Sequence, residues 1–159
     1  MTHATPQITL RRAAPADEVF LQRLFRETHT SVRDLPEPLR GALAAMQYRA
    51  RALSYASAYP QSEDWILCLD PATPIGRQLI AHHAGSLYLI DLAVLPEYQG
   101  QGIGTQILQG CISSAARDGL ALRLTVAQGN PAKLLYQRLG FTTHAEDEVN
   151  LEMVWSSRT

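Results

Sequence analysis

The sequence predicts one α/β domain with a mixed central sheet and about four helices. Short runs in which apolar residues alternate with polar ones are typical of strands, and other segments repeat apolar residues every three or four positions, as helices do. The 159 residues contain no internal repeat, linker or low-complexity tract. A chain of this length buries about 68–70% of its unfolded surface, so we expect a single domain over residues 1–159.

The first part of the chain is expected to form one strand and two helices. Residues 7–12 alternate like a strand. Pro15 opens a helix, because proline suits the first helical position. Two prolines break residues 28–38 into a loop, and a second helix ends before Pro60. The buried stripe of the first helix is Phe20, Leu21, Leu24 and Phe25. The second helix repeats apolar residues at Leu39, Leu43, Met46, Ala50 and Leu53.

The rest of the chain is expected to combine strands with two more helices. The strand expected at 86–95 is apolar on both faces except at Asp91. This pattern is typical of a central strand that is covered on both sides. Asparagine favours the start of a helix and glycine its end. The elements are strands at 65–69, 76–83 and 86–95, a helix from Ile103 to Gly119, a strand at 120–126, a helix from Asn130 to Gly140, and strands at 141–144 and 149–155.

The composition argues against several classes of protein. A formal net charge of −1 gives no electrostatic reason to expect nucleic acid as a partner. No segment approaches the roughly 20 apolar residues of a membrane helix, and residues 1–10 lack the apolar core of a signal peptide. Cys68 and Cys111 are too few for a disulfide framework and lack metal-ligand spacing, so we expect buried free thiols. A reducing, cytoplasmic location follows.

A glycine-rich turn separates the 86–95 strand from the helix that begins at Ile103. It reads Gln99-Gly100-Gln101-Gly102-Ile103-Gly104-Thr105. The first N–H groups of a helix have no intrahelical partner, and the helix dipole adds partial positive charge there. Glycines let an anion approach the backbone closely. The turn therefore predicts a phosphate-binding site, although a simple tight connection remains the alternative.

Two common phosphate ligands fit this turn poorly. A P-loop needs a lysine and then a serine or threonine after its last glycine, whereas Thr105-Gln106 follows here. A dinucleotide fingerprint needs a glycine at the position of Thr105 and an acid at the end of the next strand, and that strand ends near Val126 without one. A nucleotide-dependent enzyme is disfavoured on both counts.

Two longer segments carry a family resemblance. Residues 94–104 read Val-Leu-Pro-Glu-Tyr-Gln-Gly-Gln-Gly-Ile-Gly, and residues 130–141 read Asn-Pro-Ala-Lys-Leu-Leu-Tyr-Gln-Arg-Leu-Gly-Phe. The first resembles the acetyl-CoA motif, Gln/Arg-x-x-Gly-x-Gly/Ala, of the GNAT superfamily of acetyltransferases, and the second resembles that family's second motif. The order of elements is similar to the family fold along nearly the whole chain. The resemblance implies a GNAT-like fold in which one strand of the mixed sheet is splayed.

The resemblance also implies how acetyl-CoA binds. The pyrophosphate would lie on the backbone N–H groups of the turn, with no metal. The pantetheine arm would run beside the 86–95 strand, which would carry a bulge at residues 92–94. The positions implied to bind acetyl-CoA are Leu92, Val94, Gln99, Gly100, Gln101, Gly102, Ile103, Gly104, Thr105, Asn130, Lys133 and Tyr136.

Two catalytic roles follow from the same resemblance. The backbone N–H of Val94 would stabilise the oxyanion that develops on the thioester. Tyr136 would protonate the leaving thiolate, although it can also be a core aromatic residue beside Leu135 and Leu139. Asn130 can equally be a helix N-cap.

The general base stays open. An alkylammonium of pKa about 10.4 is almost fully protonated at neutral pH, so a base helps. Asp91 is the carboxylate of the central strand, and burial would raise its pKa, but a structural role is as plausible. Glu97 is a second candidate and more typical of a solvated turn. Tyr88 stands where some family members carry a catalytic glutamate.

Other polar residues give weaker signals. His82 and His83 are adjacent and face opposite sides of a strand, so they do not easily share a metal. His29 and His144 are isolated in the sequence, and no metal site is expected. The Glu146–Glu148 turn could form an acidic rim that favours cationic amines.

The resemblance implies direct transfer of acetyl from acetyl-CoA to a primary amine in a ternary complex. The alternative is a non-catalytic acyl-CoA-binding or sensory domain on the same fold. The expected partner is a small-molecule or peptide amine, with no nucleic acid and no membrane, and a homodimer stays open. The sequence does not name the acceptor or fix the acyl group.

Overall fold

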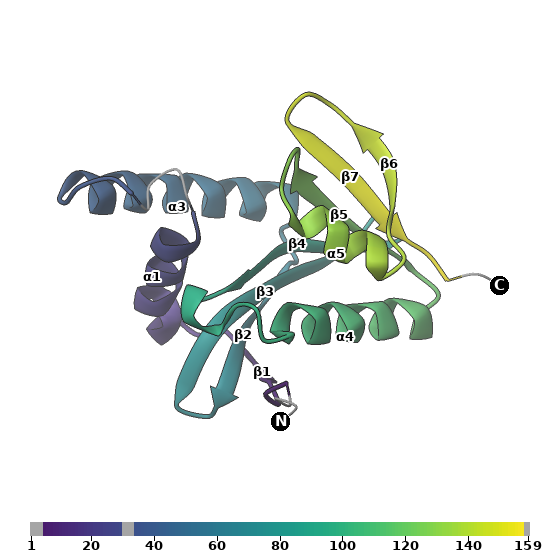
Figure 1. Ribbon diagram of the computed structural model, residues 1–159, viewed down its shortest axis with the longest axis horizontal. Helices are drawn as coiled ribbons and strands as arrows, with labels where there is room; N and C mark the ends of the chain where they lie inside the picture. The colour runs from purple at the N-terminus through teal and green to yellow at the C-terminus, as the bar shows by residue number, and fades with distance from the viewer. Residues whose placement is uncertain (1–4, 30–33, 158–159) are drawn as a thin grey trace. The chain divides into compact units, whose positions relative to one another are not determined.

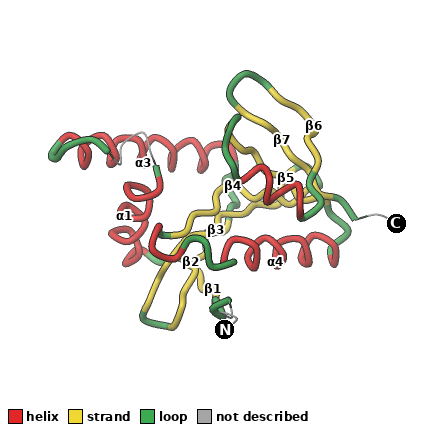
Figure 2. The backbone as a smooth tube through the Cα atoms, in the orientation of Figure 1, coloured by secondary structure: helices red, strands yellow, loops and turns green. Residues whose placement is uncertain are grey.

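A computed structural model describes residues 5–29 and 34–157 of the chain (Figure 1). The helices and strands occur in the expected order, and Figure 2 shows the loops that join them. They are β1 (Thr9–Arg12), η1 (Pro15–Asp17), α1 (Glu18–Thr28), α3 (Leu39–Ala58), β2 (Glu63–Asp70), β3 (Thr73–His83), β4 (Ser86–Val94), η2 (Pro96–Tyr98), α4 (Ile103–Arg117), β5 (Ala121–Ala127), α5 (Ala132–Arg138), β6 (Thr142–Glu146) and β7 (Asn150–Trp155).

The strands form a seven-stranded sheet in the order β1-β2-β3-β4-β5-β7-β6. The pair β4–β5 is parallel, whereas the pairs β1–β2, β5–β7 and β6–β7 are antiparallel, so the sheet is mixed, as expected. β4 lies between β3 and β5, which confirms the central place expected for this apolar strand. Its register with β5 covers Ser86–Leu89 against Ala121–Leu124, although β4 continues to Val94 and β5 to Ala127.

The chain divides into two compact units, which are described separately. The first unit comprises Met1–Leu79 and Asp91–Ile103, and the second comprises Ile80–Ile90 and Gly104–Thr159. Strands β3 and β4 contribute residues to both units. The single-domain organisation stays a prediction.

The core of the first unit is built on α1 and α3, which pack together. Residues at i, i+3 and i+4 of α1, namely Leu21, Leu24 and Phe25, are buried as expected, because this spacing places them on one helix face. The Phe25 ring meets the Tyr48 ring edge-on at 5.8 Å between centroids. Phe20 is partly buried against the same core.

The start of α1 is fixed by Asp17, a buried carboxylate. Arg11 on β1 donates two hydrogen bonds to it, at 2.8 and 2.7 Å, and the backbone N–H of Ala14 donates a third at 2.7 Å. The hydrogen bonds from Arg11 hold the pKa of Asp17 below its ordinary value, against the effect of burial. Strand β1 thereby positions α1, whose C-terminal end lines the candidate site.

Helix α3 is present as expected, but most of the apolar residues whose spacing predicted it do not face the core; Leu43 is partly buried against it. Leu39, Met46 and Leu53 are 49%, 57% and 73% exposed. The buried residues are Ala44 and Tyr48, one turn apart on another side of the helix. The seven-residue repeat of large apolar residues therefore runs along the solvent side of α3.

The second unit buries one side of β5 and β7. Alternate residues of β5 are buried, which is the pattern of a strand with one covered face. α4 contributes a helical stripe of buried residues to the same unit. The buried residues of these elements are Ile107, Leu108, Cys111, Ala115, Leu122, Leu124, Val126, Leu151 and Met153.

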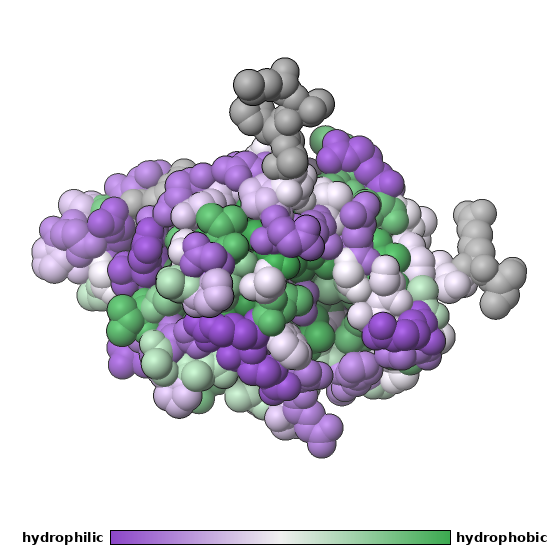
Figure 3. Space-filling view, turned by 90° about the horizontal axis from the view of Figure 1, so that it is seen from below, coloured by the Kyte–Doolittle hydropathy of each residue, from purple (hydrophilic) through white to green (hydrophobic). Residues whose placement is uncertain are grey.

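Several smaller expectations can be compared with the structure. Cys68 and Cys111 are buried free thiols, as expected. The loop expected at 28–38 begins one residue later, since Thr28 closes α1, and its residues 30–33 lie outside the described part. In the described part of the chain no helix is long and apolar enough to cross a membrane. Hydrophilic and hydrophobic residues mix on the face drawn in Figure 3.

Candidate active site

The glycine turn exposes its backbone just before α4. Gly100 and Gly102 have φ of 77° and 83°, in the left-handed region that favours glycine. A Cβ atom added at Gly100 or Gly104 would meet nothing within 4 Å, so the space over these residues is open. The turn can therefore bring an anion against the main chain.

The glutamine side chains of the turn point back toward the preceding segment. Gln99 Nε2 donates to the backbone oxygen of Val94 at 2.8 Å, and Gln101 Nε2 donates to that of Glu97 at 3.4 Å. These bonds tie the turn to the end of β4 and to η2. Both glutamines stay exposed, and their bonds hold the turn in place before Ile103, the first residue of α4.

The donor chemistry of the turn fits a pyrophosphate. Unpartnered N–H groups and the positive end of the helix dipole meet where α4 begins, at Ile103, Gly104 and Thr105. Within residues 5–29 and 34–157, no three histidine, cysteine, aspartate or glutamate side chains are grouped so that they could hold a metal.

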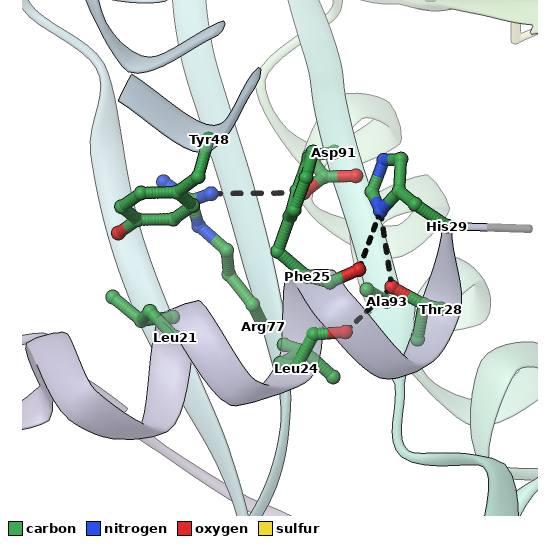
Figure 4. A pocket seen from close by; sticks show the side chains of 9 residues that line it. All are labelled: Leu21, Leu24, Phe25, Thr28, His29, Tyr48, Arg77, Asp91 and Ala93. Atoms are coloured by element: carbon green, nitrogen blue, oxygen red, sulfur yellow. Dashed lines mark hydrogen bonds and ion pairs between the residues drawn. The ribbon is translucent and has the colours of Figure 1, made fainter. Parts of the chain in front are cut away.

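A second feature of the first unit is a small, shallow pocket that is open to solvent (Figure 4). Asp91 and Ala93 reach it from β4, because alternate residues of a strand share a face. By the same alternation, the side chains of Leu92 and Val94 lie on the other face of β4. The lining residues are Leu21, Leu24, Phe25, Thr28, His29, Tyr48, Arg77, Asp91 and Ala93.

Asp91 is a weakly paired carboxylate in this pocket. Its side chain is 22% exposed, and the nearest cation is Arg77, with Nη1 at 3.7 Å from Oδ2. Arg77 is already committed to Asp64, to which it donates from Nε at 2.8 Å and from Nη2 at 2.9 Å. Burial raises the pKa of Asp91 above its ordinary value, although the charges of Arg77 and Arg51 oppose this. A carboxylate with a raised pKa is a stronger base than an ordinary one, which suits a proton acceptor.

His29 is the residue of this pocket that the sequence did not indicate. Its Nδ1 lies 2.9 Å from the backbone oxygen of Phe25, and its Nε2 lies 2.8 Å from Nη1 of Arg51. A carbonyl only accepts and a guanidinium only donates, so Nδ1 carries the hydrogen and the ring is neutral. Burial lowers the pKa of His29, which agrees with a neutral ring. Its position four residues after Phe25 was the signal available in the sequence, since i and i+4 share a helix face.

Tyr48 completes the polar part of the pocket. Its hydroxyl donates to Oε2 of Glu18 at 3.2 Å. Burial, followed by the charge of Glu18, raises the pKa of Tyr48 to about 12. Tyr48 is therefore a proton donor to Glu18 and is protonated at any physiological pH.

The remaining expected site residues belong to the second unit. Tyr136 on α5 is partly buried, and its ring lies 5.8 Å from that of Phe141 between centroids. Oδ1 of Asn130 accepts the backbone N–H of Ala132 at 2.9 Å, so Asn130 does cap the start of α5. Lys133 lies in the first turn of this helix and is partly exposed.

The residues expected to form the site are divided between the two units. Leu92, Val94 and Gln99–Ile103 belong to the first unit with Asp91, whereas Gly104, Thr105, Asn130, Lys133 and Tyr136 belong to the second. The bulge expected at residues 92–94 stays a prediction, as do the roles assigned to all of these residues.

The weaker candidates are exposed side chains with structural contacts. Glu97 Oε1 accepts from Arg23 Nη2 at 3.1 Å. His83 is exposed and meets the Tyr88 ring edge-on at 5.8 Å between centroids. In the acidic turn, Oδ1 of Asp147 accepts the backbone N–H groups of Val149 and Asn150 at 2.8 and 2.7 Å, and these bonds lower its pKa.

Comparison with known proteins identifies the family. A family model described as an acetyltransferase (GNAT) domain matches residues 61–143, more than half of the chain. The chain belongs to the GNAT acetyltransferase family. The matched region contains both the glycine turn and α5. No curated protein matches this GNAT chain by sequence.

Solved structures share the GNAT fold along nearly their whole length. The PaiA N-acetyltransferase from Thermoplasma acidophilum, in complex with coenzyme A, is 20% identical, with a TM-score of 0.72 over 95% of this chain and 99% of that chain. An acetyltransferase from Thermus thermophilus is 22% identical, with a TM-score of 0.71 over 98% of this chain and 100% of that chain. The ribosomal-protein-S18-alanine N-acetyltransferase from Escherichia coli is 19% identical, with a TM-score of 0.66 over 94% of each chain. At these identities the likeness concerns the fold alone.

Proposed function

We propose that this GNAT domain transfers an acetyl group from acetyl-CoA to a primary amine by direct attack in a ternary complex. The observation that carries the proposal is the open backbone of the glycine turn at the start of α4. Its positive φ values and the empty space over Gly100 and Gly104 suit close approach of a pyrophosphate. One T. acidophilum relative of the same fold is a complex with coenzyme A, which agrees with this choice of acyl carrier.

Acetyl-CoA would be held mainly by main-chain groups. The N–H groups of residues 100–105 would neutralise the pyrophosphate without a metal. Leu92 and Val94 would flank the pantetheine arm, while Asn130 and Lys133 on the α5 side would contact the rest of the carrier. Gln99 and Gln101 would act indirectly, because their side chains brace the turn.

The proposed chemistry needs two proton transfers from nitrogen. Asp91 accepts the first proton, which turns the ammonium into an amine that can attack the thioester carbon. The Val94 N–H stabilises the negative charge that develops on the carbonyl oxygen. As the carbon–sulfur bond breaks, Tyr136 gives its proton to the sulfur. The second nitrogen proton passes to solvent, and a solvent proton restores Tyr136. Asp91 then gives its own proton to solvent, so one proton is released for each amide formed.

An acceptor screen tests the proposal. The protein is incubated with acetyl-CoA and single amines from a library of amino acids, amines, aminoglycosides and peptides. Free CoA is followed with a thiol reagent, and the product is checked by mass spectrometry. We expect CoA release that depends on one acceptor class and matches acetylated amine in amount. A protein that binds acetyl-CoA but releases no CoA with any amine would be an acyl-CoA-binding domain instead.

A further inference from the structure

Arg51 on α3 holds its positive charge at the edge of the Asp91 pocket. Its Nη1 lies 2.8 Å from Nε2 of His29, and its guanidinium carbon lies 5.8 Å from the centroid of the Phe25 ring. The rings of Phe25 and His29 are themselves stacked, with centroids 3.7 Å apart. These contacts fix the guanidinium beside two of the residues that line the pocket.

No protein carboxylate neutralises Arg51 in the described part of the chain. His29 is neutral there, because Nδ1 donates to the Phe25 carbonyl and Nε2 accepts from Arg51. The Tyr55 hydroxyl, which also hydrogen-bonds Arg51, is neutral too, since burial raises its pKa. Helix α3 contains three arginines and no acid. Arg51 is also exposed, so a ligand can reach its planar fork of N–H donors.

Asp91 supplies the opposite charge in the same pocket. It has no hydrogen bond from any described residue and only the 3.7 Å contact to Arg77, which is already engaged by Asp64. The positive charge of Arg51 acts on Asp91, since it lowers the pKa of that carboxyl. The lining of the pocket also includes apolar side chains, among them Leu21, Leu24 and Ala93. The anionic Asp91 thus lies in the pocket, and the cationic Arg51 lies beside two of its lining residues, Phe25 and His29.

We propose that the acceptor is a small amino acid, whose ammonium binds Asp91 and whose carboxylate binds Arg51. This inference rests on the proposed acetyl transfer and adds the substrate class. A carboxylate matches the guanidinium fork in two parallel hydrogen bonds, which neither an amide nor a bare alkylamine can reproduce. A peptide N-terminus lacks a carboxylate beside its amine, so it should be a poor acceptor. Arg51 is then a specificity-determining residue, and His29 and Phe25 position its guanidinium.

Matched acceptors and matched variants test this proposal. Alanine and leucine are each compared with their amide and with the corresponding amine that lacks the carboxyl group. All of these acceptors are tested with the wild type and with the variants Arg51→Gln, Arg51→Lys and Arg49→Gln. Arg49 lies on the same helix, is exposed, and among the described residues donates only to the backbone oxygen of Ala45. The readout is kcat/KM from CoA release, with the melting temperature of every variant.

The expected pattern is a change in preference rather than a general loss. The wild type should favour each amino acid over its amide by about tenfold to a hundredfold, the range of one charge-assisted pair. Arg51→Gln should lower kcat/KM for the amino acids by that factor relative to the amides, so that the preference disappears; any effect through the pKa of Asp91 is shared by all acceptors. Arg51→Lys should retain part of the preference, because it keeps the charge without the fork. Arg49→Gln should keep all of it.

Three outcomes overturn the substrate class and leave the acetyl transfer standing. In the first, the wild-type protein uses amides or alkylamines as well as it uses amino acids. In the second, it acetylates only peptides or other amines. In the third, the Arg51→Gln variant keeps the preference for amino acids. If that variant does not fold, the wild-type preference and Arg51→Lys decide. Absence of CoA release with every amine would instead overturn the proposed function itself.

Discussion

Asp91 combines two properties that seldom occur together in a carboxylate. It lies on a central strand in a pocket with apolar walls, and it is nevertheless 22% exposed and close to two arginines. Burial disfavours its charged form, whereas the arginines favour it, and the net effect is a pKa above the ordinary value. A base must be ionised to accept a proton, so activity that depends on Asp91 falls as the pH drops through this raised pKa.

Asp91→Asn should therefore remove the acidic limb of the kcat/KM profile. The variant keeps the shape of the side chain but cannot take a proton, so we expect turnover to drop by roughly 10²–10⁴-fold and to lose this limb. The pH profile measured from pH 5 to 9 checks the prediction. Asp70→Asn, a change in the exposed β2–β3 turn, is the control and should leave the profile unchanged. Normal turnover with an unaltered limb would give Asp91 a structural role only.

Tyr136→Phe should lower kcat and leave the affinity for acetyl-CoA nearly intact. The ring keeps its contact with Phe141, and only the hydroxyl is lost. General acids contribute about 10²–10⁴-fold, and the low end applies here because a thiol of pKa about 8.5 leaves readily as thiolate. Steady-state kinetics and the melting temperature are measured together, with Tyr59→Phe as a control outside the proposed machinery. An unchanged kcat would remove Tyr136 from the mechanism, whatever happens to the melting temperature.

Single residues of the site were predictable to different degrees. Asp91 stood out because it interrupts an apolar strand. His29 and Arg51 did not, because their relevance depends on α1 and α3 packing together, which no local pattern encodes. The neutral state of His29 likewise follows from its two hydrogen-bond partners and not from its neighbours in sequence.

The glycine turn is the element whose role can be tested most cleanly. Gly102 is a poor test position, because its φ is 83° and a Cβ would lie 2.9 Å from the hydroxyl oxygen of Thr5. Any side chain there strains the backbone as well as blocking the anion. Gly104 lies in the first turn of α4, and a Cβ there meets nothing within 4 Å.

Gly104→Ala should stabilise the protein and weaken acetyl-CoA binding. Alanine in place of a helical glycine stabilises by roughly 0.5–1 kcal/mol, or about 1–4 °C in melting temperature. The added methyl group stands where the pyrophosphate approaches, so we expect about tenfold weaker binding. Gly110→Ala, in the same helix and also in open space, is the matched control. It should raise the melting temperature equally and leave binding unchanged. Wild-type affinity in both variants would exclude the turn as the phosphate site.

Helices and strands were predicted well where the spacing of apolar residues is compatible with one structure only. The stripe of α1 and the strand at 120–126 were confirmed, because each has a single covered face, whereas β1 is present but all four of its residues are exposed. The sequence did not indicate the buried face of α3, since large apolar residues repeat on its solvent side while Leu43, Ala44 and Tyr48 contact the core. Residue size in the sequence does not reveal which face a partner helix covers.

For the whole molecule, the family and the fold agree with the motifs seen in the sequence. The order of elements, the mixed sheet and the GNAT domain match were all expected. The single-domain organisation stays a prediction. The turn, Asp91 and Tyr136 remain proposals about chemistry on this confirmed fold.

Titration calorimetry of acetyl-CoA against the wild-type protein, with excess EDTA and then with added Mg²⁺, tests the central claim most directly. The claim is that backbone N–H groups of the glycine turn bind the pyrophosphate and no metal takes part. The account predicts saturable binding of one acetyl-CoA per chain with the same affinity in both conditions, and weaker binding to Gly104→Ala in both. Binding that appears only with Mg²⁺, or no binding in either condition, would contradict it.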